Sequence, residues 1–390
     1  MAHRSRYGSG SIRPKGDGRW ELRVSAGRDP ATGRSRYVSR TVRGSKREAE
    51  AALAGLLVGV TQGRDLPTTD ATVRDLVEQW LDLRRETLSV TTYEAYLAKA
   101  RFRLLPAIGD VPVRKLGVRD IDALYRTLSR DVGLAASTVR QIHNILTGSL
   151  DQAVRWGWRA DNPAKLATLP SIRAAEVRPP SPADVVAAIA MADLELATFL
   201  RLAASVGGRR GEVSALRWTN VDLVAGELVI AKALVEKADR TIIEKDTKTH
   251  QARRVAIDAG TVAALRAWRA EVERRADIVG VPLRTDGFLF GPTADGSAPW
   301  RPFHWTSAWR RLREKAGIDS TVRLHDLRHF AATRLLDAGI PVKTVSGRLG
   351  HARPATTLNV YAHFIPASDR LAADTMGEIL SGGPPSTGAG

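Results

Sequence analysis

The sequence contains no cysteine among its 390 residues. This absence excludes disulfide bonds, thiolate metal sites and cysteine nucleophiles together. No stretch is apolar for long enough to span a bilayer, and the first twenty residues contain no apolar run of the kind found in signal peptides. We therefore expect a cytoplasmic protein with no membrane partner.

What the sequence has in excess is positive charge. The formal net charge is +17 and the sequence pI is about 10.7, which favours a polyanionic partner. Nucleic acid is the commonest such partner and an acidic membrane surface the second. The basic residues are spread through every segment, and no long basic amphipathic helix stands out. This distribution favours a protein that contacts nucleic acid along much of its length.

The first segment, residues 8–63, is predicted to form a small three-stranded sheet followed by a helix. Trp20, Leu22 and Val24 alternate with polar residues, and a glycine-rich turn leads to a second alternating run. Ser45 and Glu48 form a capping box that opens the helix. The basic residues of the strands and turns are expected either to contact DNA or to form a solvated face; they include Arg23, Arg36, Arg40 and Arg43.

The second segment, residues 72–170, follows a polar linker and has four helical patterns, which predict an all-helical domain. Its basic residues, Lys99 and Arg101 among them, are candidates for clamping a duplex, although a solvated helical face would have the same composition. The third segment, residues 178–380, follows a proline-rich linker. It mixes helices with a strand-rich stretch and is predicted to be α+β and mainly helical. The tail 381–390 lacks long apolar side chains and is expected to be disordered.

One stretch of the third segment, "LHDLRHFAATRLL" from Leu324 to Leu336, places His325, Arg328 and His329 on one face of an amphipathic helix. A histidine pair four residues apart is the spacing of zinc-binding helices, but those have glutamate after the first histidine, and here Asp326 stands there. A His-x-x-Arg pair also suits the binding of a phosphate oxygen. A third alternative is a solvated surface helix.

Three further stretches of this segment are informative, at residues 205–218, 246–257 and 347–364. The first has glycines around Arg209 and Arg210, an arrangement that lets the backbone approach a ligand. It does not have the spacing of a phosphate-binding loop of nucleotide hydrolases. In the second, we interpret Lys248 as lying near the turn of a hairpin, where its ammonium reaches a neighbouring site or solvent.

Taken together and in this order, the four stretches resemble the catalytic domain of the tyrosine recombinases, the phage-type integrases. The resemblance is carried by five short motifs: GGRRGE at 207–212, TKT at 247–249 followed by RRV, HDLRH at 325–329, LGH at 349–351 and NVYAH at 359–363. Segments 8–63 and 72–170 also resemble the arm-type and helical core-binding (SAM-like) domains of integrases. The resemblance thus covers nearly the whole chain.

The resemblance implies a role for each matching residue. Arg209 and Arg328 would stabilise the phosphate under attack, Lys248 would be the general acid, and Tyr361 the nucleophile. His325 and His351 would handle protons or donate hydrogen bonds to the phosphate, with Glu212 and His329 as supports. Two guanidiniums can stabilise the negative charge that gathers on a phosphodiester under attack. A tyrosine with an ordinary pKa near 10 needs a proton acceptor or nearby positive charge to act as a nucleophile at neutral pH.

The implied function is site-specific recombination of double-stranded DNA through a 3′-phosphotyrosyl intermediate by a homotetramer, integrating or excising a mobile element without a metal or cofactor. An excisionase or a host accessory factor is a further expected partner. Three alternatives remain: a DNA-binding regulator that has lost cleavage, a topoisomerase of type IB, and a metallohydrolase. The last would use His325, His329 and one of His351 or His363 as ligands.

Overall fold

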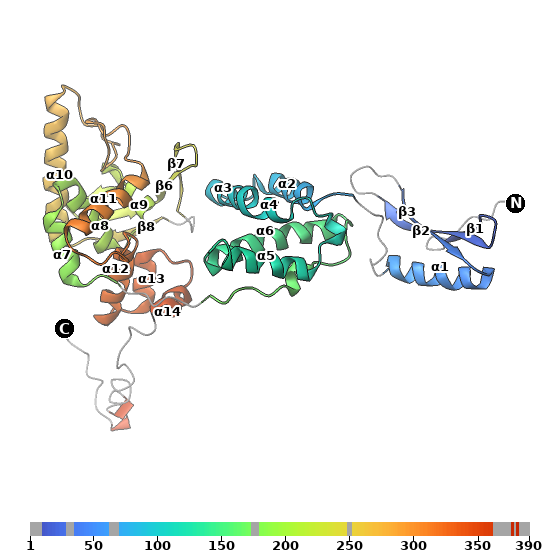
Figure 1. The fold of residues 1–390 in the computed structure, drawn as a ribbon. Coiled ribbons are helices and arrows are strands. Elements are labelled where there is room, and N and C mark those ends of the chain that lie inside the picture. Colours follow the sequence, from blue (N-terminus) through green and yellow to red (C-terminus); the bar gives the residue numbers. More distant parts are fainter. Residues whose placement is uncertain are drawn as a thin grey trace. The chain divides into compact units, whose positions relative to one another are not determined.

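The computed structural model describes residues 10–28, 35–61, 70–172, 179–247, 252–361, 376–377 and 380–381. The chain divides into two compact units, Met1–Ala174 and Ala175–Gly390 (Figure 1). Of the helices in the described ranges, none is both long and apolar enough to cross a membrane. The predicted disordered tail falls, apart from Ser381, outside the described residues.

The chain begins with an antiparallel sheet that is covered on one face by a helix, as the alternation of apolar residues predicts. Leu22 and Val24 of the sheet pack with Ala49 and Leu56 of the helix in a small core. The capping box is present, since the Ser45 amide donates to Glu48 Oε2 at 2.7 Å. The elements are β1 (Ser11–Pro14), β2 (Arg19–Arg28), β3 (Ser35–Arg43) and α1 (Lys46–Thr61), with sheet order β1-β2-β3.

The register of this sheet separates the arginines that the sequence analysis grouped together. Arg23 pairs with Ser39 and Arg43 with Arg19, on the face opposite α1, and the Arg23 guanidinium lies 4.0 Å from the centre of the Tyr37 ring. Arg40 instead pairs with Leu22, on the face that packs against α1. The prediction of one apolar and one basic face is therefore wrong for Arg40, because an odd spacing between two strand residues reverses their faces. The side chain of Arg36 lies outside the described part of the chain.

Residues 70–172 form a bundle of helices around their own core, as the four helical patterns predict. Trp80, Tyr125 and Leu146 are among the side chains buried there. Lys99 ends α3 and is half-buried, and Arg101 is exposed in the π-helical turn that follows. The elements are α2 (Val73–Arg84), α3 (Val90–Lys99), the π-helical turn (Ala100–Leu104), α4 (Leu105–Ile108), a 3₁₀ turn (Val113–Lys115), α5 (Val118–Arg130), α6 (Ala136–Arg155) and a second 3₁₀ turn (Pro163–Leu166).

The C-terminal unit is mainly helical with short strands. α8 packs against α7, α10 and α12, and α13 contacts α12, α14 and β8. The elements are α7 (Pro182–Met191), α8 (Leu194–Val206), α9 (Arg210–Ser214), a 3₁₀ turn (Trp218–Asn220), β4 (Val221–Asp222), β5 (Glu227–Ile230), β6 (Lys232–Glu236), β7 (Ile242–Asp246), β8 (Arg253–Ala256), α10 (Ala259–Ile278), α11 (Pro302–Lys315), α12 (Asp326–Asp337), α13 (Val342–Leu349) and α14 (Pro354–Tyr361).

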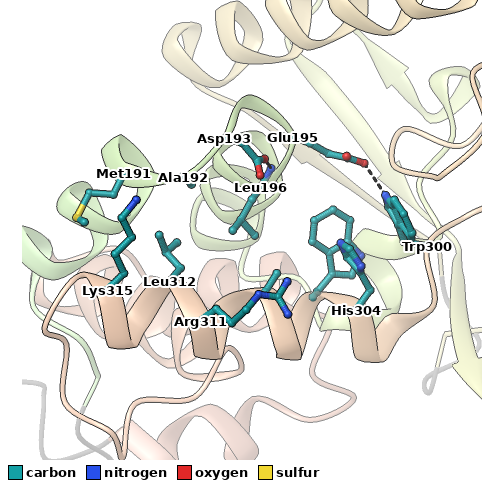
Figure 2. Close-up of a pocket in the computed structure, with 12 residues that line it drawn as sticks. Met191, Ala192, Asp193, Glu195, Leu196, Trp300, His304, Arg311, Leu312 and Lys315 are labelled. Carbon is teal, nitrogen blue, oxygen red and sulfur yellow. Dashed lines mark hydrogen bonds between the residues drawn. The ribbon is translucent and has the colours of Figure 1, made fainter.

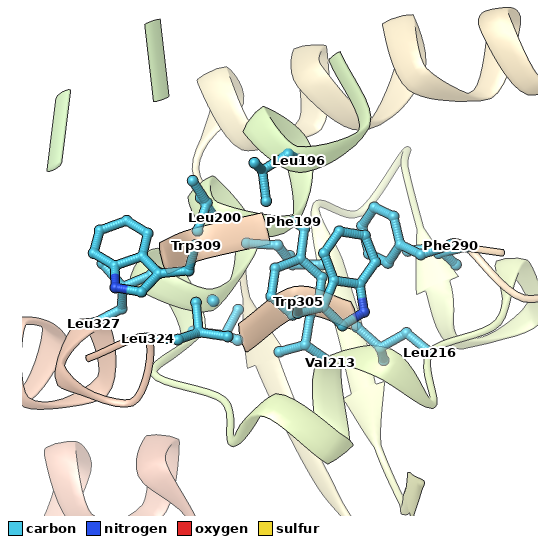
Figure 3. Packing of buried hydrophobic residues seen from close by; sticks show 14 of the residues in the cluster. Leu196, Phe199, Leu200, Val213, Leu216, Phe290, Trp305, Trp309, Leu324 and Leu327 are labelled. Carbon is cyan, nitrogen blue, oxygen red and sulfur yellow. The ribbon is translucent and has the colours of Figure 1, made fainter. Parts of the chain in front are cut away.

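Aromatic side chains fill the centre of this unit (Figure 3). The rings of Phe199 on α8 and Trp305 on α11 are stacked with centres 3.9 Å apart, and Phe290 meets both edge-on. Leu324 and Leu327 reach the same core from the start of α12. Because large aromatic side chains contribute much buried area, this core gives the ends of α8 and α12 a rigid foundation.

The strands of this unit form two separate sheets. β5 pairs with β4 and β8, whereas β6 and β7 form a hairpin of their own. The sequence analysis interpreted residues 246–257 as one hairpin that turns at "THQA". In the described residues, however, the strand before that turn pairs with β6 and the strand after it pairs with β5. The alternation of apolar residues identifies strands but does not specify their partners.

Candidate active site

The first candidate arginine lies where α8 ends and the short α9 begins. Arg209 immediately precedes α9, and its backbone amide donates to Glu212 Oε2 at 3.0 Å. The nearby glycines serve the packing of the chain. A Cβ at Gly211 would collide with the backbone carbonyl of Leu234 in β6. The expectation that these glycines admit a ligand is thus replaced, at Gly211, by close contact between α9 and β6.

Glu212 is buried and holds two arginines with its two oxygens. Arg209 Nη1 donates to Oε1 at 2.7 Å, and Arg253 Nη2 donates to Oε2 at 2.6 Å. Burial by itself raises the pKa of this carboxyl, but the hydrogen bond and charge of Arg253, with those of Arg209, outweigh burial and lower the pKa. Glu212 is therefore ionised at neutral pH, and it fixes one edge of the Arg209 guanidinium.

Arg328, the second candidate arginine, is 3% exposed. Its Nη1 donates to the carbonyl of Gly207 at the end of α8 and to the carbonyl of Leu349 at the end of α13, both at 2.7 Å. The alternative of a solvated surface helix is therefore wrong for Arg328. Arg328 inserts between two helix ends, whose carbonyls carry partial negative charge and favour a cation.

The two histidines of the same motif lie at the start of α12. His325 immediately precedes the helix, and its ring meets the ring of His329 edge-on, with centres 5.3 Å apart. Burial, followed by the charges of His329 and Arg328, lowers the pKa of His325 to about 4. Burial also lowers the pKa of His329, against the opposing effect of Asp326. Both imidazoles are therefore neutral at pH 7.

His351 follows the left-handed turn that ends α13. Gly350 has φ of +70°, a conformation that glycine adopts without strain. The Nδ1 of His351 lies 2.7 Å from the hydroxyl of Thr357, which is fully buried on α14. Burial and the charges of Arg328, Arg209 and Arg253 lower the pKa of His351 to about 4. His351 is thus neutral at pH 7 and linked to α14.

The structure brings most of the predicted residues together. The charges of Arg209 and Arg328 act on both His325 and His351, so these four residues lie within electrostatic reach of one another. Lys248 lies outside the described residues, in the gap between Thr247 and Ala252. Tyr361 is the last residue of α14, one turn after Thr357, and its side chain is not described. His363 also lies outside the described residues.

Two residues of this site received no role from the sequence. Arg253 belongs to the RRV motif, and Thr357 to the stretch 347–364. A signal for Arg253 was available, because strand alternation puts it on the same side as Val255, which is buried. A buried arginine requires partners, so this alternation alone indicates a structural or catalytic contact.

Cavities elsewhere do not compete with this site. A cavity of about 530 Å³ lies between α7, α8 and α11 (Figure 2), and it contains none of the candidate catalytic residues. Trp300 Nε1 donates to Glu195 beside it at 2.8 Å, and burial raises the pKa of that carboxyl. Within the described ranges, no three His, Asp or Glu side chains are grouped so that they could hold a metal ion. The metallohydrolase alternative therefore has no ligand set among these residues.

Comparisons with known proteins give matches over most of the chain. The model of the phage integrase family matches residues 183–367, and that of the phage integrase N-terminal SAM-like domain matches residues 72–129. A XerC-like tyrosine recombinase of Caldanaerobacter subterraneus is 26% identical, with 86% of this chain and 90% of the relative covered. The ICEBs1 integrase of Bacillus subtilis is 24% identical, with 95% of this chain and 100% of the relative covered.

A solved structure has the same fold. The Tn1549 transposon integrase, in complex with transposon right end DNA, aligns with a TM-score of 0.67 and 18% identity. The alignment covers 78% of this chain and 98% of that one. Family models, full-length relatives and fold lead to one conclusion. The chain belongs to the phage integrase family of tyrosine recombinases, enzymes of site-specific recombination.

Proposed function

We propose that this recombinase cleaves and rejoins double-stranded DNA through a covalent bond between Tyr361 and a 3′ phosphate. The observation that carries the proposal is the convergence of Arg209 and Arg328, two guanidiniums held by Glu212 and by helix-end carbonyls beside two neutral histidines. Donors fixed before the reaction stabilise developing charge without a cost of reorganisation. The formal charge of +17 supports a DNA substrate.

In the first step, the Tyr361 oxygen attacks the scissile phosphorus while its phenolic proton passes to the neutral His325, and the bond from phosphorus to the 5′ oxygen breaks. Lys248 gives its proton to that leaving oxygen. Arg209 and Arg328 donate hydrogen bonds to the non-bridging oxygens, where negative charge gathers. In the second step a 5′ hydroxyl attacks the phosphotyrosine and releases Tyr361. One phosphoester replaces another in each step, so no ATP is consumed.

The neutral histidines have two tasks in this scheme. His325 accepts a proton or a hydrogen bond at the edge of the site, since its low pKa leaves a lone pair available at pH 7. For His351, a hydrogen bond from the Thr357 hydroxyl to Nδ1 leaves the ring proton on Nε2, which then donates to the phosphate. Glu212 orients the Arg209 guanidinium, and the His329 ring packs against the ring of His325.

We also propose a separate function for each segment of the chain. Residues 8–63 would bind an arm-type DNA site through Arg23 and Arg43, residues 72–170 would clamp the core site with Lys99 and Arg101, and residues 178–380 would cut. Four protomers would assemble on two DNA sites to integrate or excise a mobile element. The ICEBs1 integrase, which matches over its full length, supports a function in integration. An excisionase or host factor would determine whether integration or excision is favoured.

The test is covalent trapping. The protein is incubated in EDTA with a pool of nicked, end-labelled duplexes of randomised core sequence, and adducts are separated on a denaturing gel. Wild type and Tyr96→Phe, a control on α3, should give an adduct, and Tyr361→Phe should bind DNA without forming one. DNA binding with no adduct from wild type would support the regulator alternative instead. Cutting of the labelled DNA without any adduct, seen with added divalent metal and lost in EDTA, would support metal-dependent hydrolysis.

A further inference from the structure

Arg253 is largely shielded from solvent although it begins an edge strand. Its side chain is 9% exposed, whereas that of Arg254, the next residue on β8, is 68% exposed and pairs with Glu227 at the surface. Removing a guanidinium from water is costly unless its donors are satisfied. The burial of Arg253 therefore indicates that its contacts serve the fold or the reaction.

The contacts of Arg253 reach three separate segments. Its Nη2 donates to Glu212 on α9 at 2.6 Å, and its Nε donates to the carbonyl of Arg348 at the end of α13 at 3.0 Å. Its Nη1 is buried without a hydrogen-bond partner among the described residues. That nitrogen lies against Gly350, where an added Cβ would stand only 2.8 Å from it. A side chain at position 350 would therefore displace Arg253.

These contacts connect Arg253 to both candidate catalytic arginines. The Glu212 oxygen that Arg253 leaves free is the one that accepts from Arg209. The Arg348 carbonyl is adjacent along the chain to the Leu349 carbonyl, which accepts from Arg328. Without Arg253, Oε2 of Glu212 keeps only the Arg209 amide as a donor, so this oxygen as well as Oε1 can accept from the Arg209 guanidinium. The carboxylate then draws that guanidinium into a bidentate pair and away from the substrate.

We propose that Arg253 is a positioning residue for DNA cleavage: it occupies one oxygen of Glu212 so that Arg209 stays directed at the scissile phosphate, and it ties α9 to the end of α13. This inference rests on the proposed function. It assigns to β8 a role in the geometry of the phosphate site. Arg253 itself does not touch the DNA.

The test compares Arg253→Lys and Arg253→Gln with Arg254→Gln, the matched control on the same strand. Lysine keeps the charge but cannot donate in two directions from a planar group. At saturating nicked DNA, we expect adduct formation to slow by on the order of 10-fold or more in both Arg253 variants, because such supporting contacts commonly contribute this much to activity. Arg254→Gln should stay within about twofold of wild type, and the dissociation constant for DNA should not change in any variant.

A second substrate separates positioning from loss of folded protein. A methylphosphonate at the scissile position removes one charged oxygen and so reduces the need for Arg209. The ratio of the rates on phosphate and methylphosphonate is measured within one preparation, so inactive protein does not affect it. We expect this ratio to fall in Arg253→Lys, as in Arg209→Lys, and to stay at the wild-type value in Arg254→Gln.

The outcomes are distinguishable. An Arg253→Lys ratio equal to that of wild type, with an adduct still formed by wild type and Arg254→Gln, would overturn the positioning role alone. Absence of an adduct from wild type on every substrate would overturn the proposed function. A fall in the ratio of equal size in Arg254→Gln would also overturn the inference, because it would attribute the effect to charge on β8 in general.

Discussion

Arginines in the N-terminal sheet and in the candidate active site are fixed by different means. Arg23 rests on the ring of Tyr37, and Arg43 is exposed at the end of β3. Arg209, Arg253 and Arg328 are instead held by a buried carboxylate and by helix-end carbonyls. A guanidinium that neutralises a DNA phosphate does not need one exact orientation, whereas one that stabilises a transition state must be oriented beforehand. Under the proposed function, the two regions would use one residue type for two purposes, DNA affinity in the sheet and reaction rate in the active site.

The largest difference should come from replacing an arginine by lysine in each region. Arg328→Lys removes the guanidinium nitrogen that donates to the carbonyls of Gly207 and Leu349. We therefore expect adduct formation at saturating DNA to fall by on the order of 10²- to 10³-fold. Arg43→Lys should leave that rate unchanged, since lysine also neutralises a phosphate. Single-turnover trapping measures both. Equal losses in the two variants would contradict the distinction.

A second contrast compares a buried with an exposed ion pair in the absence of DNA. Glu212→Gln leaves Arg253 buried without its anion, so we expect the free energy of unfolding to fall by about 3–5 kcal/mol. Glu227→Gln, which removes the partner of Arg254, should cost about 0–1 kcal/mol. Urea unfolding measures both changes, and a similar loss in the two variants would refute the contrast.

The difference in unfolding free energy between wild type and Glu212→Gln should depend on pH, and the sign of this dependence follows from the pKa of Glu212. The folded-state pKa of Glu212 is lowered below its ordinary value of 4.5, so its stabilising charge is fully present above that pH. The charge is lost as the pH falls through the lowered pKa. Wild type and Glu212→Gln should therefore converge in stability only below about pH 4.5.

The sheet arginines should instead govern the salt dependence of DNA affinity. We expect Arg23→Gln and Arg43→Gln each to reduce the slope of log affinity against log salt by about 1, because each phosphate contact releases counterions. Arg40→Gln should change the slope less, since Arg40 lies on the α1 face. Binding titrations at several salt concentrations measure the slopes. A larger effect of Arg40 than of Arg23 would contradict the assigned face.

The smallest effect is a shift in titration. In the free protein, NMR of the imidazoles should give midpoints of about 4 for His325 and His351, below the ordinary 6.5. The unfolded chain binds more protons than the folded one between these values, so the two histidines make stability rise with pH there. Midpoints near 6.5 would show that the two rings are less buried, and the cations around them farther away, than in the structure.

The sequence predicted the elements of this molecule better than their contacts. The helices of residues 70–172 and the capped α1 were predicted correctly from local patterns, because periodicity and capping act over a few residues. The partners of β7 and β8 were not, since they depend on residues far along the chain. For the site, the motifs identified Arg209 and Arg328, but the burial of Arg328 depends on two helix ends that no local pattern reveals.

The backbone acceptors of this site have a consequence for mutational scanning. Arg328 is held by the carbonyls of Gly207 and Leu349, and Arg348 donates to the carbonyl of Ser205 at 3.0 Å. A carbonyl is common to every residue type, so exchanging the side chain of Ser205 leaves its acceptor in place. A mutational scan of side chains would therefore identify the arginine donors as essential but would not detect the backbone carbonyls that accept from them. Replacement of single amides by esters, which weakens a chosen carbonyl as an acceptor, would reveal their contribution.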